Sequence, residues 1–184
     1  MLKFLFYAFI GRFEHSYADD GSYMHSLVDI DRRGFWQFSR VAAAGEYRAA
    51  LPITAFFAAK LAATLHEDCG PCAQLVIRTA LQAGVLAAVL MALVRGDDDG
   101  AGPDAASAFR FAQAVPLNSP DLDARRAAVT ARFGARVPAF LGLTTVIARM
   151  FPVLKRAMGY ADACVRLDIA GTPVAPVKAS RVAA

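Results

Sequence analysis

The sequence is poor in cysteine, in runs of like charge and in β-strand patterns. Three cysteines among 184 residues are too few for a disulfide-rich scaffold. The net charge of +4 is spread along the chain and not gathered in a basic run, so we expect no nucleic-acid partner. Alternating β-branched residues between turn dipeptides are missing, so no strand is predicted. These absences favour a helical protein of one domain.

Two apolar segments look like targeting or membrane signals. Residues 2–10 (LKFLFYAFI) are followed by the charged Arg12 and Glu14, where a cleaved signal would be uncharged. We therefore expect an amphipathic helix that ends near residues 11–13. Residues 83–94 (AGVLAAVLMALV) are fewer than the roughly 20 that cross a bilayer, and they predict a buried helix. We expect a cytoplasmic protein, where thiols stay reduced, with no membrane span.

Apolar residues make up 57% of the sequence and recur at helical spacing in almost every segment. This pattern predicts an all-α bundle of about seven or eight helices. We expect a single domain at 1–170, in which an N-terminal helical extension (1–50) precedes a core (51–165). A loose tail at 171–184 follows. Because the apolar helices exceed what one small core hides, a homo-oligomer is expected.

Helix boundaries follow from proline, glycine and capping residues. The spacing predicts helices over 52–66 and 72–83, one on each side of a cysteine motif. Residues 97–100 are predicted to be a loop. Ser119 is the expected cap of a helix whose first residue is Pro120. A long helix over 137–160 contains Pro152, where a kink or a restart is expected.

One motif carries candidate chemistry, the tetrapeptide CGPC at residues 69–72. Two cysteines three apart can form an intramolecular disulfide and exchange it with another thiol. At a helix start, free N–H groups and the helix dipole lower a thiol pKa from about 8.5 to about 3.5–7.5. We expect Cys69 at the exposed end and Cys72 in the first helical turn. His66 and Glu67, next to the pair, are candidate catalytic proton acceptors.

Other interpretations of the cysteines and their surroundings stay open. A zinc site needs two further ligands, and the sequence lacks their usual paired spacing. Buried cysteines without chemistry are a second alternative. His25 is a candidate relay, Gln74 a candidate hydrogen-bond donor to a substrate oxygen, and Cys164 is expected only to pack. Residues 97–99 (DDD) lack the closing glutamate of a calcium loop, so we expect neither a metal nor an organic cofactor.

The four letters CGPC also occur in thioredoxin, where they follow a strand, whereas here they follow a predicted helix. The helix–CxxC–helix arrangement resembles the alkylhydroperoxidase D-like (AhpD-like), carboxymuconolactone decarboxylase superfamily over roughly residues 50–165. The resemblance rests on AAKLA at 58–62 and CGPCAQLV at 69–76. It implies an all-helical homo-oligomer whose dithiol reduces peroxides or partner disulfides. Cys72 would then be the thiolate that meets peroxide and Cys69 the resolving partner.

The sequence departs from that superfamily at both proton-relay positions. The relay histidine, four residues after the second cysteine, is Val76 here, and the relay glutamate, twelve before the first, is Phe57. The predicted function is a thiol-dependent antioxidant oxidoreductase that takes a peroxide or disulfide substrate and a protein or small-molecule thiol reductant. One alternative is a non-catalytic helical oligomer with structural cysteines. Another is a membrane-peripheral protein docked through residues 4–13.

Overall fold

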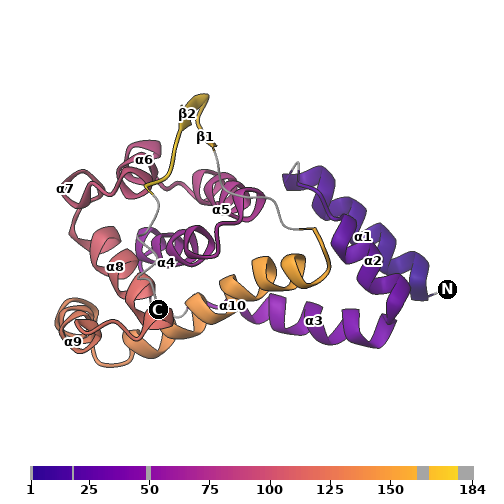
Figure 1. Ribbon diagram of the computed structural model, residues 1–184, viewed down its shortest axis with the longest axis horizontal. Helices are drawn as coiled ribbons and strands as arrows, with labels where there is room; N and C mark the ends of the chain where they lie inside the picture. The colour runs from indigo at the N-terminus through magenta and orange to yellow at the C-terminus, as the bar shows by residue number, and fades with distance from the viewer. Residues whose placement is uncertain (1, 18, 49–50, 161–165, 178–184) are drawn as a thin grey trace.

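The structure is a computed structural model of the chain, and it describes residues 2–17, 19–48, 51–160 and 166–177. These ranges form ten helices and one two-stranded sheet, which confirms the all-α prediction and raises the number of helices (Figure 1). In chain order the elements are α1 (Leu2–Tyr17), α2 (Ser22–Ile30), α3 (Arg32–Ala44), α4 (Ile53–His66), α5 (Gly70–Gln82), α6 (Ala87–Arg95), α7 (Asp98–Ala101), α8 (Pro103–Leu117), α9 (Leu122–Phe133), α10 (Val137–Ala157), β1 (Leu167–Ile169) and β2 (Thr172–Val174).

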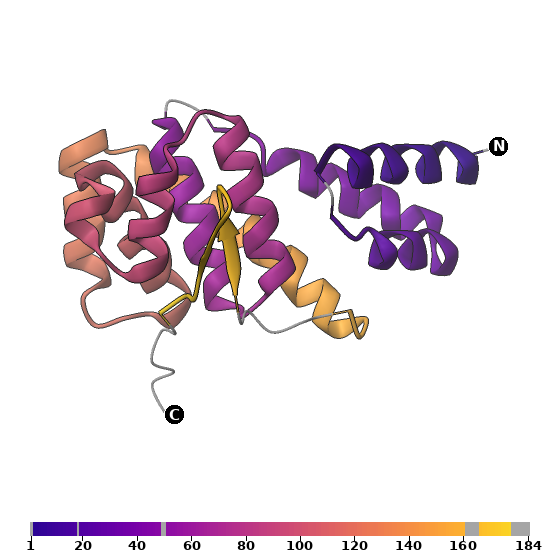
Figure 2. The ribbon, with the colours of Figure 1, turned by 90° about the horizontal axis from the view of Figure 1, so that it is seen from above.

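Helices α1, α2 and α3 form a layer at one end of the molecule, beside the other helices (Figures 1 and 2). Asp31 joins α2 to α3, and its carboxylate accepts backbone hydrogen bonds from Arg33 and Gly34, which caps α3. The layer has its own apolar cluster, separate from the main core. Its buried members are Ile10, Tyr23, Met24, Val28 and Phe35.

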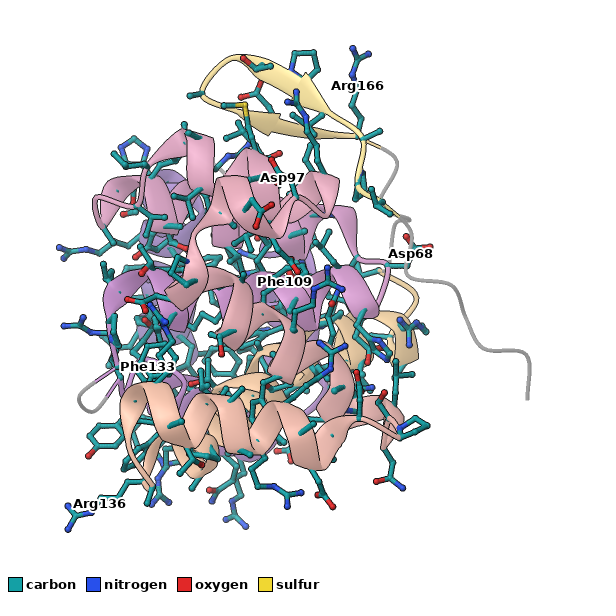
Figure 3. All side chains as sticks on the ribbon, turned by 90° about the vertical axis from the view of Figure 1, so that its left-hand side faces the viewer. Asp68, Asp97, Phe109, Phe133, Arg136 and Arg166 are labelled. Carbon is teal, nitrogen blue, oxygen red and sulfur yellow. A yellow bond between two sulfur atoms is a disulfide. The ribbon has the colours of Figure 1, made fainter. Side chains whose placement is uncertain are left out.

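The main core is built around α4, which is buried on nearly all sides. Nine of its side chains are buried, and five of these are alanines. A helix that is apolar all round lies inside a protein, and small alanine side chains let neighbouring helices approach closely. Accordingly, α4 packs against α8, α10 and α5. Figure 3 shows the α7, α8 and α9 side of this core, where Phe109 of α8 is buried.

The long helix α10 also belongs to this core. By length and composition it could cross a membrane, and no other helix of the described ranges could. The sequence reading did not find it because Arg149, Lys155 and Arg156 interrupt the apolar run. In the fold, Leu141 and Ala148 are buried in the side of α10 that packs on α4. α10 therefore packs on the main core along one side.

A small β-hairpin contradicts the expectation of no strand and of a tail from residue 171. β1 and β2 are antiparallel, with Ile169 paired to Thr172 across a turn in which Ala170 and Gly171 have φ of 52° and 80°. The hairpin packs on α5 and α6. Its buried side chains, Leu167 among them, join the main core. Three-residue strands are too short to show an alternating pattern, which is why the sequence gives no strand signal there.

Two further helix boundaries differ from the prediction for local reasons. α1 continues to Tyr17 and does not end near residues 11–13, and the rings of Phe13 and Tyr17 pack 5.1 Å apart in this added turn. The predicted loop at 97–100 contains the short helix α7. The carboxylate of Asp97 accepts a hydrogen bond from the backbone of Gly100 and caps it.

The proline positions also need correction. Pro120 does not open a helix, because α9 begins at Leu122. The carboxylate of Asp121 binds the Ser119 hydroxyl and the Arg125 guanidinium just before that start. Pro152 does not restart α10, which is one helix to Ala157. Pro152 is buried and removes one backbone N–H donor from α10, and the helix continues past it.

Candidate functional site

The turn between α4 and α5 holds both cysteines of the CGPC motif. Asp68 takes a left-handed backbone conformation there, with φ of 54°. Cys69 is the N-cap of α5, and its sulfur accepts a hydrogen bond from the backbone N–H of Cys72 at 3.4 Å. The sulfurs of Cys69 and Cys72 are joined as a disulfide, and the Cα atoms are 5.3 Å apart. The structure therefore brings the pair together. Helix α5 begins at Gly70, two residues before the predicted start at 72.

Both cysteines are buried, which corrects the expectation that Cys69 lies at an exposed end. Cys69 is 1% exposed and Cys72 is 5% exposed. The reason is that the Cys69 sulfur turns onto the first turn of α5, where it caps the helix. Cys72 differs from Cys69 because it is one of the residues that line a cavity.

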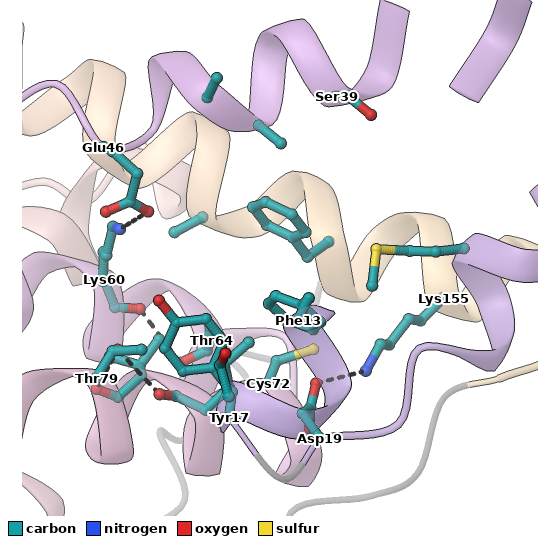
Figure 4. Close-up of a pocket in the computed structure, with 18 of the residues that line it drawn as sticks. Phe13, Tyr17, Asp19, Ser39, Glu46, Lys60, Thr64, Cys72, Thr79 and Lys155 are labelled. Atoms are coloured by element: carbon teal, nitrogen blue, oxygen red, sulfur yellow. Dashed lines mark hydrogen bonds and ion pairs between the residues drawn. The ribbon is translucent and has the colours of Figure 1, made fainter. Parts of the chain in front are cut away.

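This cavity, of about 870 Å³, lies between the α1–α3 layer and helices α4, α5 and α10 (Figure 4). Its wall is mostly apolar and includes Phe13 and Phe151. Phe57 of α4 and Val76 of α5 line the same cavity as Cys72. Neither side chain can carry a proton.

An ion pair that sequence reasoning missed stands in the wall of the same cavity. Asp19, between α1 and α2, faces Lys155 of α10 with the carboxylate oxygen and the ammonium nitrogen 3.8 Å apart. The two side chains are only 7% and 6% exposed. The Lys155 ammonium also lies 4.9 Å from the centre of the Tyr23 ring. Figure 4 shows Cys72 on the Asp19–Lys155 side of the cavity, away from a second pair, Glu46–Lys60.

Burial shifts the pKa of the carboxyl group in this pair. Burial raises the pKa of the Asp19 carboxyl above its usual 3.8, although the charges of Lys155 and Arg78 oppose the rise. One sequence signal points to Lys155 alone. Lys155 follows the buried Ala148 and Pro152 at helical spacing, so it is a lysine on the apolar face of α10. Asp19 carries no such signal, because it lies between two helices.

Glu67, a predicted proton acceptor, is held by two arginines. Its carboxylate accepts hydrogen bonds from Arg149 and Arg156, and Arg156 also donates to the Glu67 backbone carbonyl at 2.6 Å. Burial alone would raise the pKa of Glu67, but the two guanidinium groups outweigh it and lower the pKa below its usual 4.5. A carboxylate held ionised in this way is a weak base. Its position marks it as a connection between α10 and the cysteine turn.

His66, the other predicted acceptor, lines a different cavity. This second cavity, of about 440 Å³, lies beside α6 and α8 and also includes Asp68. Cys72 belongs to the first cavity, so the structure places His66 and Cys72 on different cavities.

The remaining candidates have structural partners or lie outside the described ranges. The Gln74 amide exchanges two hydrogen bonds with the backbone of Asp168, both at 2.8 Å. His25 packs on the ring of Tyr7 and lies 3.3 Å from Glu14 in the N-terminal layer. Cys164 lies outside the described residues. Among the described residues, no three histidines, cysteines or carboxylates gather as a metal site.

Compared with family models, with curated proteins and with solved structures, the chain has no match. Function is therefore argued from the site itself.

Proposed function

We propose that the chain is a dithiol oxidoreductase that reduces small organic hydroperoxides through Cys72 and Cys69, with no metal or organic cofactor. One observation carries the proposal: Cys72, bonded to its neighbouring cysteine, lines an apolar cavity of about 870 Å³. Cavities of roughly 300–1,000 Å³ with few polar groups are typical of small-molecule sites. The resemblance of residues 50–165 to the AhpD-like superfamily supports the same chemistry.

The proposed reaction oxidises the dithiol in two steps. The Cys72 thiolate attacks the terminal oxygen of the hydroperoxide, an S–O bond forms and the O–O bond breaks. Cys72 becomes a sulfenic acid, and the departing alkoxide takes a proton to become an alcohol. The Cys69 thiol then attacks the sulfenic sulfur, which forms the disulfide and releases water. Two molecules of an external thiol reduce the disulfide and are themselves oxidised.

Burial favours a small oxidant over a protein disulfide. Thiol–disulfide exchange requires direct access of one sulfur to another. With Cys69 and Cys72 exposed by 1% and 5%, a folded partner has little surface to attack, whereas a small hydroperoxide enters through the cavity. For the same reason we propose a low-molecular-weight thiol as the reductant.

A second candidate is a non-catalytic helical protein whose cysteines are structural. The burial of both cysteines and the capping of α5 by the Cys69 sulfur favour it. It predicts thiols that react with neither peroxide nor alkylating agents until the protein unfolds.

The test uses the reduced full-length protein and one equivalent of cumene hydroperoxide. We expect the loss of two thiols per chain, formation of a Cys69–Cys72 disulfide by mass spectrometry and release of cumyl alcohol. Alkylation by iodoacetamide should show one thiol titrating below about pH 7.5. Thiols that stay unreactive at every pH until denaturation would establish the structural candidate instead.

Three variants assign the roles of the cysteines. Cys72→Ser should abolish peroxide consumption. Cys69→Ser should consume one equivalent and leave a sulfenic acid on Cys72 that dimedone traps. Cys164→Ser is the matched control and should behave as the wild-type protein. Peroxide consumption by Cys72→Ser, with a sulfenic acid trapped on Cys69, would reverse the assignment.

A further inference from the structure

We infer that Asp19 is the proton-transfer residue of the Cys72 site and that Lys155 positions it. The inference rests on the proposed peroxide reduction and adds residues from the N-terminal layer and from α10. Three observations carry it: Asp19, Lys155 and Cys72 line one cavity, the two charged side chains are almost fully buried, and Phe57 and Val76 supply no ionisable group.

The burial of the pair is difficult to explain by stability alone. Removing two charges from water costs several kcal/mol per ion, and their attraction often fails to recover it. At 3.8 Å the contact between Asp19 and Lys155 is long for a hydrogen-bonded ion pair. The pair therefore adds little to the stability of the fold, while it places an acid and a cation in the wall of the cavity that Cys72 also lines.

The surroundings of Asp19 suit a carboxyl that exchanges protons. Burial raises the pKa of Asp19 above its usual 3.8, although the charges of Lys155 and Arg78 oppose the rise. The adjacent Asp20 raises it slightly, and the buried phenol of Tyr23 stays neutral because burial also raises its pKa. A general base works best when its pKa lies nearer the working pH than that of an ordinary aspartate.

The proton path follows from these positions. The Asp19 carboxylate accepts the proton of the Cys72 thiol, so that a thiolate and a neutral carboxyl face the bound hydroperoxide. When the sulfur attacks and the O–O bond breaks, the carboxyl returns the proton to the alkoxide, and the alcohol leaves. Asp19 ends ionised, as it began. Lys155 holds the carboxylate toward the cavity, while electrons pass only from the Cys72 sulfur to the peroxide oxygen.

The test measures the rate at which cumene hydroperoxide oxidises the reduced full-length protein in a single turnover, from pH 5 to pH 9. In Asp19→Asn we expect a rate at least about 100-fold lower at pH 7, the usual contribution of a general base. The rate should then rise about tenfold per pH unit until the thiol ionises near pH 8.5. The wild-type rate should depend on the Asp19 carboxyl and fall only at acidic pH.

Two further variants separate chemistry from structure. Asp19→Asn/Lys155→Met removes both charges and leaves no buried cation unpaired, so it should fold and still be slow with the same pH profile. Asp29→Asn is the control, because Asp29 pairs with Lys3 in the same N-terminal layer but does not line the cavity, and its rate and profile should follow the wild type.

Each outcome bears on one claim. If the wild-type protein does not react with the hydroperoxide, the proposed function fails. If the wild type reacts and the double variant matches it in rate and pH profile, Asp19 is not the proton-transfer residue, while the proposed function stands. If Asp29→Asn is slowed as much as Asp19→Asn, the rate follows the overall charge of the N-terminal layer, and the assignment to Asp19 is overturned.

Discussion

At the residue scale, Glu67 connects the cysteine turn to the rest of the core. Its carboxylate binds Arg149 and Arg156, both on α10, and it is the C-cap residue that follows α4. Hydrogen bonds to charged groups contribute more to the stability of the fold than hydrogen bonds between neutral groups. A buried carboxylate also has little water to replace a lost partner. Glu67 therefore fixes where the turn begins, and with it the start of α5.

We predict that Glu67→Gln lowers the free energy of unfolding by about 1–3 kcal/mol at pH 7. The lowered pKa of Glu67 means that its contribution is present above the unfolded value near 4.5 and is lost as the pH falls through the folded pKa. Urea unfolding should thus show a difference between variant and wild type that shrinks below about pH 4. Asp123→Asn, which removes an exposed ion pair, is the control and should change stability by less than about 1 kcal/mol. A difference that persists unchanged at pH 3 would contradict the electrostatic explanation.

At the element scale, the side chain of Gln74 on α5 forms hydrogen bonds with the β-hairpin. Gln74 donates to the Asp168 carbonyl and accepts from its N–H, as a neighbouring strand would. The hairpin is too short to be stable in isolation. Its buried side chains and this amide attach it to the core next to the cysteine helix.

We predict that Gln74→Ala loosens the hairpin while the helices stay folded. Two hydrogen bonds are lost, so the free energy of unfolding should fall by about 1–3 kcal/mol. Hydrogen exchange should accelerate at 167–174 before it changes in α4. Gln37→Ala, at an exposed glutamine of α3, is the control. Unchanged exchange at 167–174 would mean that apolar packing alone holds the hairpin.

At the scale of the whole molecule, helix α1 exposes several large apolar side chains on the N-terminal layer. Phe4 and Leu5 of α1 are 76% and 60% exposed. By contrast, the apolar run at 85–94 buries most of its large side chains, so it needs no partner to cover it. Part of the exposed apolar surface therefore lies on α1, and we propose that a second copy of the chain covers it.

We predict that Phe4→Asp/Leu5→Asp converts an oligomer to a monomer, because charge on an apolar contact disfavours association. Sedimentation equilibrium measures the mass directly. Leu86→Asp replaces an equally exposed residue outside α1 and should leave the mass unchanged. A wild-type monomer that sediments with anionic vesicles, and a double variant that does not, would support membrane docking through α1 instead of self-association.

The helical class and the cysteine pair could be predicted from the sequence, because both follow from spacing along one segment. Apolar periodicity identified most helices, and the Cys69–Cys72 spacing allows a disulfide across a single turn whatever surrounds it. The arginines on Glu67 and the amide contact of Gln74 could not be predicted from the sequence, since each depends on a distant segment.

The residues that line the cavity with Cys72 follow from the tertiary structure alone. Asp19 and Lys155 come from opposite ends of the chain, and they meet only because the α1–α3 layer folds against α10. No local pattern encodes such a meeting, since the free energy that drives it is spread over the many apolar contacts of the core. The short hairpin also depends on tertiary packing, because Leu167 and Ile169 of its first strand are buried in the main apolar core.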